Sequence, residues 1–537
     1  MLRPLPLAAV VVVLGLATAA YVFDLRHTPV YFGGDEAHFA NHGYSLATTG
    51  RDLSGNKFPL FVNLCDPLGD PQVQQQYRAW DQPVLFYVIA ATLKVLPLDE
   101  VSVRLPTALI GGLLNPVLMY VVAMRILKHR LLAVISVLVV ALSPAHLLLS
   151  RQALDYALPI PFLLAWLWCL VTFVERGGVG KAFAGGLLLG VGFYSYIAAW
   201  FFMPMCLVMS WLTYYRAGRD PRRASLAAAV GFALPLTLLA PWWYSHPEMF
   251  RDTFGRYLIR EAENLTLAQG ASRLVGLAGI ERAISTYLGY FDPVFLFVRG
   301  GVSMTTSTNR SGVLLLAVAP LLIAGIYDVV RRLRRDVFAA VLIGGLLLAP
   351  IPAALVGEGA MIQREVFMLP FAALIAGVGA ALLLNQKQPV ARTVVLVLLI
   401  AMPLQFAYVY RDYFTHYKLR SAFYYDPVVF GEVADSLLSA ASSGDVPVIY
   451  FSHDLDDGGP KWRFYATKFH RADLLGRTRY VDVARAELAE AKAGSLLVIY
   501  SGSVHRAGLV SSGRWAIVTE ISDVDRRPAS VVLRKTY

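Results

Sequence analysis

Long apolar segments recur from the amino terminus to about residue 410, and the short polar stretches between most of them carry Lys and Arg. A segment of about twenty predominantly apolar residues is long enough to cross the hydrocarbon core of a membrane as a helix. The pattern predicts an all-α polytopic membrane bundle with about eleven transmembrane helices. They are expected at about residues 5–23, 104–124, 131–149, 156–174, 182–197, 199–215, 224–243, 312–330, 337–356, 365–384 and 391–410.

The composition agrees with a chain that lies mostly in lipid. Hydrophobic residues make up 57% of it and charged residues 16%, and the mean hydropathy is +0.55. The net charge is +11, but the basic residues cluster in short loops, which is typical of a multispanning protein and argues against nucleic-acid binding. Three cysteines, Cys65, Cys169 and Cys206, are too few and too scattered for a disulfide framework or a zinc site.

One shorter apolar segment, Pro83 to Leu98, decides the predicted topology. It has about sixteen residues and includes Lys94, so it is short for a span. As a full span it would place the basic clusters of the following loops outside, whereas as a helix at the membrane interface it places them all in the cytoplasm. We therefore expect an interfacial helix over 83–98, a cytoplasmic amino terminus, and external loops over 24–82 and 245–311.

After about residue 411 the long apolar segments end and the sequence pattern becomes that of a water-soluble α/β domain. Four short β-rich runs follow, at residues 446–451, 495–500, 515–518 and 530–533. Residues 484–493 are good helix formers, and Gly494 is a stop signal. By the count of spans this tail lies outside the cell membrane. We predict a transmembrane domain over 1–411 and a small carboxy-terminal extracytoplasmic α/β domain over 412–537.

Two adjacent carboxylates, Asp35 and Glu36, lie among glycines and aromatics in the first external loop. Four more charged residues stand at the external ends of three predicted spans, namely Arg104, Asp155 and the adjacent pair Arg364 and Glu365. A charged side chain at membrane depth is costly, so each is a candidate functional residue. A carboxylate on this face could act as a general base toward an acceptor hydroxyl, while guanidinium groups hold a lipid phosphate.

The sequence contains no glycine-rich nucleotide-binding loop. The glycines of residues 185–192 lie within a predicted span, where small residues allow close packing of helices. A sugar donor that is linked to a lipid phosphate and delivered outside the cytoplasm fits this pattern. The candidate charges therefore favour sugar transfer from such a lipid.

Several short motifs follow one another along residues 1–240. They are Gly34-Asp35-Glu36-Ala37, Arg104-Leu105-Pro106, the stretch from Ala141 to Asp155, and Gly192-Phe193-Tyr194-Ser195-Tyr196. This ordered set resembles the GT-C membrane glycosyltransferases. Within that superfamily it is similar to the bacterial relatives of the dolichyl-phosphate-mannose protein mannosyltransferases, which include the lipid A aminoarabinose and rhizobial galacturonic acid transferases.

The resemblance implies a GT-C fold with an interfacial helix after the first loop, in agreement with the charge count. It also implies that Asp35 is the catalytic base with Glu36 beside it, and that Arg104 binds the donor phosphate. Further candidates are Asp155 for catalysis and Arg364 and Tyr194 for substrate binding.

The chain departs from this branch at Trp80-Asp81-Gln82-Pro83-Val84-Leu85, where the relatives often have an acid followed by Lys-Pro-Pro-Leu. A lysine able to touch the substrate is therefore missing. Some relatives bind a divalent metal through that acid and a distant histidine, and Asp81 and His246 are the corresponding pair here. A divalent metal is thus the cofactor that the resemblance leaves open.

We interpret the chain as a multi-pass glycosyltransferase of the bacterial inner membrane. It is expected to move a sugar from a polyprenyl-phosphate donor to a lipid, glycan or protein acceptor on the periplasmic side. Two other interpretations stay open: a transporter or lipid flippase whose charges line a path, and a non-catalytic scaffold whose outer domain binds a partner. Inverted repeats or mid-span charges would favour a transporter, and neither is evident in the sequence.

The predicted topology can be tested with single introduced cysteines. A cysteine at Ala217, in a loop that we place in the cytoplasm, should resist a membrane-impermeant thiol reagent added to intact cells, because the basic loops stay inside. A cysteine at Ser443, in the outer domain, should react. Rapid labelling at position 217 would contradict the interfacial interpretation of residues 83–98.

Overall fold

A computed structural model describes residues 6–66, 68–70, 80–250, 252–253, 276–455, 457–484, 488 and 490–537. The chain forms two compact units. The first consists of Met1–Phe23, Asp81–Leu85 and Leu105–Tyr413, and the second of Asp24–Trp80, Phe86–Arg104 and Phe414–Tyr537. We expected the first external loop to belong to the transmembrane domain, but it groups with the carboxy-terminal tail.

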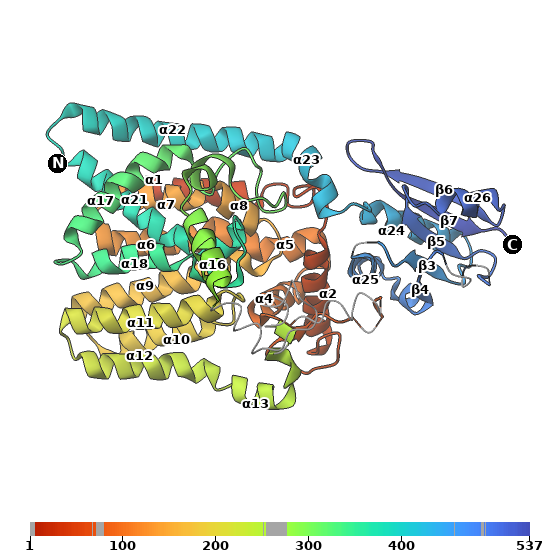
Figure 1. Ribbon diagram of the computed structural model, residues 1–537, viewed down its shortest axis with the longest axis horizontal. Helices are drawn as coiled ribbons and strands as arrows, with labels where there is room; N and C mark the ends of the chain where they lie inside the picture. Colours follow the sequence, from red (N-terminus) through yellow and green to blue (C-terminus); the bar gives the residue numbers. More distant parts are fainter. Residues whose placement is uncertain are drawn as a thin grey trace. The chain divides into compact units, whose positions relative to one another are not determined.

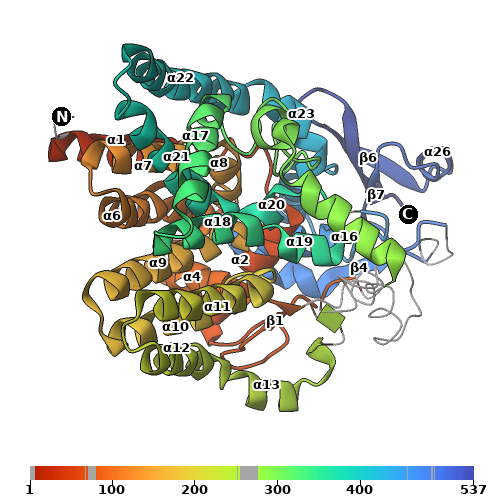
Figure 2. The ribbon, with the colours of Figure 1, turned by 60° about the vertical axis from the view of Figure 1, so that its left-hand side comes forward.

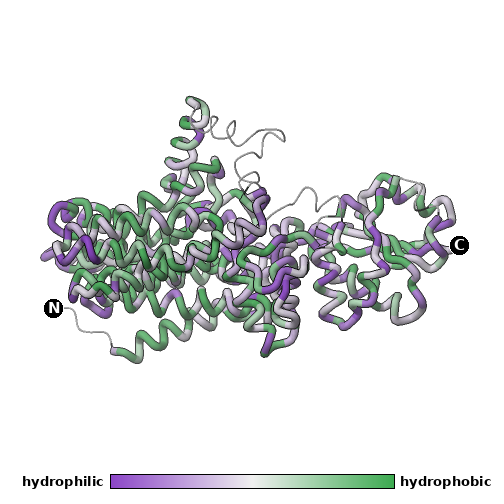
Figure 3. Tube along the Cα trace, turned by 90° about the horizontal axis from the view of Figure 1, so that it is seen from below, coloured by the Kyte–Doolittle hydropathy of each residue, from purple (hydrophilic) through white to green (hydrophobic). Residues whose placement is uncertain are grey.

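The first unit is a bundle of mainly apolar helices (Figure 1). Figure 3 shows hydrophobic residues along most of these helices and hydrophilic residues in the turns at the left-hand end of the bundle. The helices are α1 (Leu7–Val22), α6 (Asn115–Leu127), α7 (Arg130–Ala141), α8 (Pro144–Ser150), α9 (Pro159–Arg176), α10 (Val179–Gly192), α11 (Ala199–Ala217), α12 (Pro221–Leu236), α13 (Leu239–Ser245), α16 (Leu277–Gly289), α17 (Ala319–Arg332), α18 (Val337–Leu348), α19 (Ile351–Val356), α20 (Ile362–Glu365), α21 (Met368–Leu384) and α22 (Pro389–Phe414), with the short turns η1 (Ile110–Leu114), η2 (Asp155–Ala157), η3 (Phe295–Arg299) and η4 (Leu316–Val318).

The helices confirm a polytopic membrane protein, but they do not confirm eleven full-length spans. In the described part of the chain, five helical segments are long and apolar enough to cross a membrane: Glu100–Leu127, Asp155–Arg176, Pro221–Ser245, Val337–Val356 and Pro389–Phe414. A sixth is obtained if α7 and α8 form one span, bent by 59°. Several expected spans, such as α1, α10 and α21, are helices of 17 residues or fewer. Hydropathy alone overestimated their length.

The bend between α7 and α8 has a local cause. Pro144 cannot continue a helix from α7, because it has no backbone N–H and its ring clashes with the preceding turn. Ser143 instead caps a new helix, in which its hydroxyl accepts the backbone N–H of His146 at 3.2 Å. The same hydroxyl donates to the Val313 carbonyl at 2.7 Å. The predicted span over 131–149 is therefore broken.

Glycines bring α10 and α12 into close contact, and the two helices lie side by side in Figures 1 and 2. A Cβ atom added to Gly186 would lie 2.0 Å from the Ala228 carbonyl oxygen. A Cβ added to Gly231 would lie 2.2 Å from the Phe183 carbonyl oxygen. Small residues are needed on both helices, which confirms the close packing expected for the glycines of residues 185–192.

The second unit contains the helices of the first loop and the carboxy-terminal domain. Its helices are α2 (Gly34–Thr49), α4 (Pro83–Leu93), α5 (Glu100–Leu109), α23 (His416–Tyr425), α24 (Phe430–Ser443), α25 (Gly458–Lys468), η5 (Ala472–Arg477) and α26 (Arg506–Ser511). Most residues of α4 belong to this unit, and α5 begins in it. The two-residue strands β1 (Val62–Asn63) and β2 (Trp80–Asp81) lie within the predicted first loop and pair with each other. The predicted interfacial helix over 83–98 corresponds to α4, which has 11 residues. At about 1.5 Å per residue it is too short to cross a hydrocarbon core of about 30 Å.

The carboxy-terminal domain is built on a mixed five-stranded sheet. Its strands stand in the order β4 (Thr478–Val481), β3 (Ile449–Ser452), β5 (Leu496–Tyr500), β7 (Pro528–Lys535) and β6 (Trp515–Ser522). Strand β3 is parallel to β4 and β5, whereas β7 is antiparallel to β5 and β6. Residues 496–499 of the central strand are all fully buried, as expected for a strand covered on both faces.

The predicted β-rich runs all form strands, which confirms a carboxy-terminal domain with a β-sheet. Strand β4 and helices α24 and α25 were not predicted. The helix predicted over 484–493 falls partly on residues outside the described part of the chain, and no helix is described there.

Gly186→Ala should lower the melting temperature of the purified protein. Its Cβ would have to push the α12 backbone away, and overpacking of this kind typically costs about 1–3 kcal/mol. The matched control is Gly180→Ala on the same helix, where nothing lies within 4 Å of the added atom. Equal melting temperatures for both variants in detergent would contradict the tight α10–α12 contact.

Candidate active site

The acidic signature lies in the first turn of α2. Gly33 is the residue before the helix, and the Glu36 carboxylate accepts the Gly33 backbone N–H at 3.1 Å. A carboxylate at this position satisfies one of the backbone N–H groups that have no partner within the helix. The expected loop therefore contains a 16-residue helix that begins at Gly34.

The two adjacent carboxylates have opposite environments. Glu36 is 1% exposed, whereas Asp35 is exposed to solvent. Consecutive residues of a helix are about 100° apart around its axis, so they point in different directions. Asp35 is the second residue of α2, where the helix dipole favours a negative charge.

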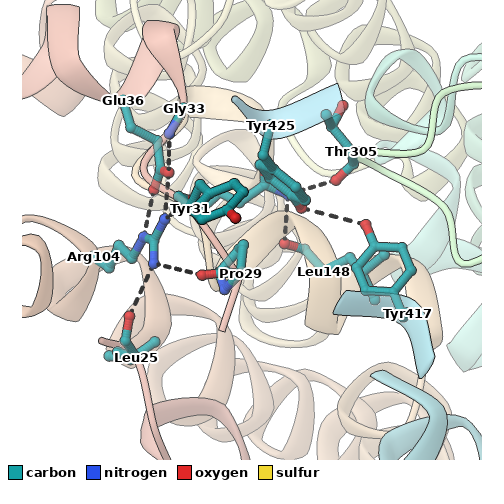
Figure 4. Close-up of polar contacts among 11 residues, drawn as sticks. Leu25, Pro29, Tyr31, Gly33, Glu36, Arg104, Leu148, Thr305, Tyr417 and Tyr425 are labelled. Atoms are coloured by element: carbon teal, nitrogen blue, oxygen red, sulfur yellow. Dashed lines mark hydrogen bonds and ion pairs between the residues drawn. The ribbon is translucent and has the colours of Figure 1, made fainter. Parts of the chain in front are cut away.

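Glu36 forms a bidentate ion pair with Arg104 of α5 (Figure 4). Arg104 Nε donates to Glu36 Oε1 at 2.8 Å, and Nη2 donates to Oε2 at 2.7 Å. Nη1 donates to the carbonyls of Leu25 and Pro29, at 3.0 and 3.2 Å. Nη2 also reaches the Tyr31 carbonyl at 2.7 Å. These bonds engage every nitrogen of the guanidinium group, which is buried together with its partner.

This geometry bears on two expected roles, which stay predictions. A donor phosphate could bind Arg104 only by displacing Glu36 or a backbone carbonyl. Glu36 would have to give up a bond to a guanidinium or to a helix N-terminus before it could take a proton from an acceptor. The pair fixes the backbone around Asp35, which is the exposed carboxylate of the signature.

In the first unit, α20 and η2 contact each other and carry two further candidates. Asp155 begins η2 and is 8% exposed. Arg364 of α20 donates through Nε to Glu358 Oε2 and through Nη1 to the Tyr196 hydroxyl, both at 2.6 Å. The structure thus brings Asp155 and Arg364 to neighbouring elements, with Arg364 already bound to an anion.

Tyr194, an expected substrate-binding residue, hydrogen-bonds to a backbone carbonyl. Its hydroxyl donates to the Pro235 carbonyl at 3.0 Å, and its side chain is largely buried. The aromatic residue that reaches a candidate charge is Tyr196, two positions later, whose ring also lies below the Arg364 guanidinium at 5.5 Å. The motif Gly192-Phe193-Tyr194-Ser195-Tyr196 marked the right segment, but it did not distinguish the two tyrosines.

Glu365, which the sequence marks with Arg364 at a span end, is a buried acid. It is 1% exposed, and neither carboxylate oxygen has a hydrogen-bond partner in the described part of the chain. The residue precedes α21.

The expected metal pair, Asp81 and His246, stays a prediction. Among the described residues, no three His, Cys, Asp or Glu side chains form a group that could hold a metal ion. The His246 ring stacks on Trp242 at 4.1 Å, and its Nδ1 lies 3.2 Å from the Trp242 carbonyl oxygen.

A buried histidine packs within the same helix as Asp35. His42 Nδ1 accepts the Leu53 backbone N–H at 3.4 Å, and Nε2 has no hydrogen-bond partner among the described residues. Burial, with smaller electrostatic effects of His38 and Arg463, lowers the pKa of His42 well below its ordinary value. Protonation of His42 therefore opposes the folded state.

We expect His42 to make the protein less stable in mild acid. Above a pH of about 6.5 the residue is neutral in both states, whereas below it the unfolded chain takes up a proton that the folded chain cannot. The melting temperature should fall as pH is lowered from neutral toward 5, and His42→Asn should reduce that fall. The control is His470→Asn, at an exposed position. An unchanged pH dependence in His42→Asn would contradict this assignment.

Comparisons with known proteins extend this description. Residues 81–244 match the sequence model of the dolichyl-phosphate-mannose-protein mannosyltransferase family. A comparison with curated proteins found no match. Solved structures similar to the chain over most of its length include ArnT from Cupriavidus metallidurans bound to undecaprenyl phosphate, with a TM-score of 0.57, 15% sequence identity and 98% of both chains covered. The same protein in the apo state has a TM-score of 0.58 and 14% identity, again with 98% of both chains covered. The archaeal oligosaccharyltransferase AglB from Archaeoglobus fulgidus, in complex with an inhibitory peptide and a dolichol-phosphate, has a TM-score of 0.50 and 12% identity, and the match covers 92% of this chain and 69% of AglB.

At these identities the structural comparisons establish the fold. The chain has an ArnT-like fold with a mostly helical membrane bundle and a carboxy-terminal β-sheet. The resemblance expected from the ordered motifs is confirmed over residues 81–244, which match the dolichyl-phosphate-mannose-protein mannosyltransferase family.

Proposed function

We propose that this chain is an integral-membrane glycosyltransferase that moves a sugar from a polyprenyl-phosphate donor to a lipid, glycan or protein acceptor. The observation that carries the proposal is the placement of Asp35. It is an exposed carboxylate in the first turn of α2, and the buried Glu36–Arg104 pair fixes the backbone beside it. The match of residues 81–244 to a mannosyltransferase family supports the reaction class.

The similar structures support the class of donor. ArnT from Cupriavidus metallidurans was solved with undecaprenyl phosphate, and AglB from Archaeoglobus fulgidus with a dolichol-phosphate. Both ligands are phosphates of long isoprenoid lipids. A donor of the same kind, delivered within the membrane, suits a chain with an ArnT-like fold.

In the proposed reaction Asp35 accepts the proton of the acceptor hydroxyl as that oxygen attacks C1 of the donor sugar. The bond between C1 and the phosphate oxygen breaks, and polyprenyl phosphate leaves with the electron pair. A carboxylate in the first turn of a helix is kept ionised by the helix dipole, and an exposed carboxylate is within reach of an acceptor. Asp155 is the second candidate base.

Arg364 is the cation that we propose for the donor phosphate. Its guanidinium binds the Glu358 carboxylate, so donor binding would exchange one anion for another. A charge-assisted hydrogen bond contributes about 1.5–3 kcal/mol. Arg104 stays the second candidate for the phosphate, and donor binding there would have to displace the buried Glu36 carboxylate. We place the reaction on the periplasmic side of the bacterial inner membrane, with the amino terminus in the cytoplasm.

Asp35→Asn should reduce sugar transfer by about 10²- to 10⁴-fold, because it keeps the shape of the side chain and removes the base. The measurement is release of undecaprenyl phosphate from undecaprenyl-phosphate-linked hexose and pentose donors by protein in nanodiscs, with envelope extracts as acceptors. Asp445→Asn is the matched control, since that carboxylate is 82% exposed and lies in the carboxy-terminal domain.

Two results would contradict parts of the proposal. Transfer by Asp35→Asn within a few-fold of the parent protein would exclude Asp35 as the base and make Asp155 the next residue to test. Movement of the lipid-linked sugar across a vesicle membrane with its sugar–phosphate bond intact, and no transfer to any acceptor, would favour a flippase instead.

A further inference from the structure

Four short contacts between polar side chains are among those that join the first part of the second unit to its carboxy-terminal domain. They are Arg463 Nε to Asp66 Oδ2 at 2.5 Å, His453 Nδ1 to Asp70 Oδ2 at 2.6 Å, Lys468 Nζ to Glu100 Oε2 at 2.7 Å, and the Tyr31 hydroxyl to Asp523 Oδ1 at 2.6 Å. In the first three, the carboxylate comes from residues 66–100 and the basic group from residues 453–468. The two surfaces are complementary in charge.

These contacts are not ordinary surface ion pairs. The side chains of the three carboxylate–base pairs are between 7% and 21% exposed. The Arg463–Asp66 pair is bidentate, because Nη2 also binds Oδ1 at 2.5 Å. Bidentate and partly buried pairs hold a fixed geometry, whereas exposed pairs contribute little. The carboxy-terminal domain is therefore firmly attached to the first loop.

Helix α25 continues this attachment along α2. The Phe464 ring stacks on Phe32 with centroids 4.4 Å apart, and the Asn41 side-chain amide donates to the Pro460 carbonyl at 2.8 Å. At the start of α25, Asp457 lies against Gly34, where an added Cβ would be 1.8 Å from Asp457 Oδ2. Gly34 directly precedes Asp35. The contacts with α25 thus lie on both sides of the candidate base.

We propose that the carboxy-terminal domain acts as a clamp that positions the first turn of α2, with Arg463 as a positioning residue for Asp35. The clamp consists of the three ion pairs and the α2–α25 contact. Its catalytic consequence rests on the proposed function, whereas its structural part does not. It assigns a role to the domain that the sequence left without one.

The proposed effect on catalysis depends on how far contacts restrict the backbone at the first turn of α2, which carries Asp35. The Glu36–Arg104 pair fixes the backbone before and within the first turn. The clamp restricts the same turn through the contacts of Phe32 with Phe464 and of Gly34 with Asp457. A shift of about 1 Å in a catalytic group can reduce a rate by about 10²-fold. Loosening the clamp should therefore affect turnover more than donor binding.

The test is charge reversal in the full-length protein. Arg463→Asp and Asp66→Arg should each lower kcat by about 10- to 100-fold and change the KM for the undecaprenyl-phosphate-linked donor by less than about two-fold. The double variant, with both charges exchanged, should recover most of the activity. The matched control is Arg477→Asp, whose partner Asp445 lies in the same domain. Full activity in both single variants would overturn the proposal.

A second readout does not depend on activity. Hydrogen–deuterium exchange of the backbone amides at residues 33–36 should become faster in Arg463→Asp and return toward the parent rate in the double variant. Lys468→Glu, which would repel Glu100 at a more exposed position, should act in the same direction. Unchanged exchange at these amides in a folded Lys468→Glu variant would overturn the clamp. Faster exchange in a chain that transfers no sugar would leave the clamp standing and contradict the proposed function.

Discussion

The ion pair between Glu36 and Arg104 is the interaction on which the arrangement of the candidate site depends. Both charges are removed from water, and such a pair is stable only where the remaining donors also find partners. Arg104 meets this condition by binding three backbone carbonyls that precede α2. Removal of one partner would leave a buried charge uncompensated, which typically costs about 3–5 kcal/mol.

This constraint separates the roles of two neighbouring carboxylates. Glu36 closes the end of α2 and neutralises Arg104, so its oxygens are already engaged. Asp35, one position earlier, lies on a different side of the helix and is exposed. The carboxylate that we propose as the base therefore stands beside one that is held in an ion pair, and the fixed position of the second supports the placement of the first.

Ion pairs also join distant parts of the chain within the second unit. The second unit combines the first loop with a domain nearly 400 residues later in the chain, and complementary charges join them. In the first unit, packing depends instead on glycines that bring α10 against α12 and on a proline that divides α7 from α8. Apolar helices associate through close backbone contact, whereas the more polar second unit also uses ion pairs.

The sequence alone determined the class of protein, the positions of most apolar helices, the acidic signature at Asp35 and the strands of the carboxy-terminal sheet. These features are local, because hydropathy and β-propensity act over a few residues. The helix lengths were less well predicted, since Pro144 and Gly192 end helices within apolar runs. Only the tertiary structure could show that Arg104 binds Glu36 and that Arg463 binds Asp66. Those partners are 68 and 397 residues apart, and no local pattern specifies which of many carboxylates a guanidinium will meet once the chain has folded.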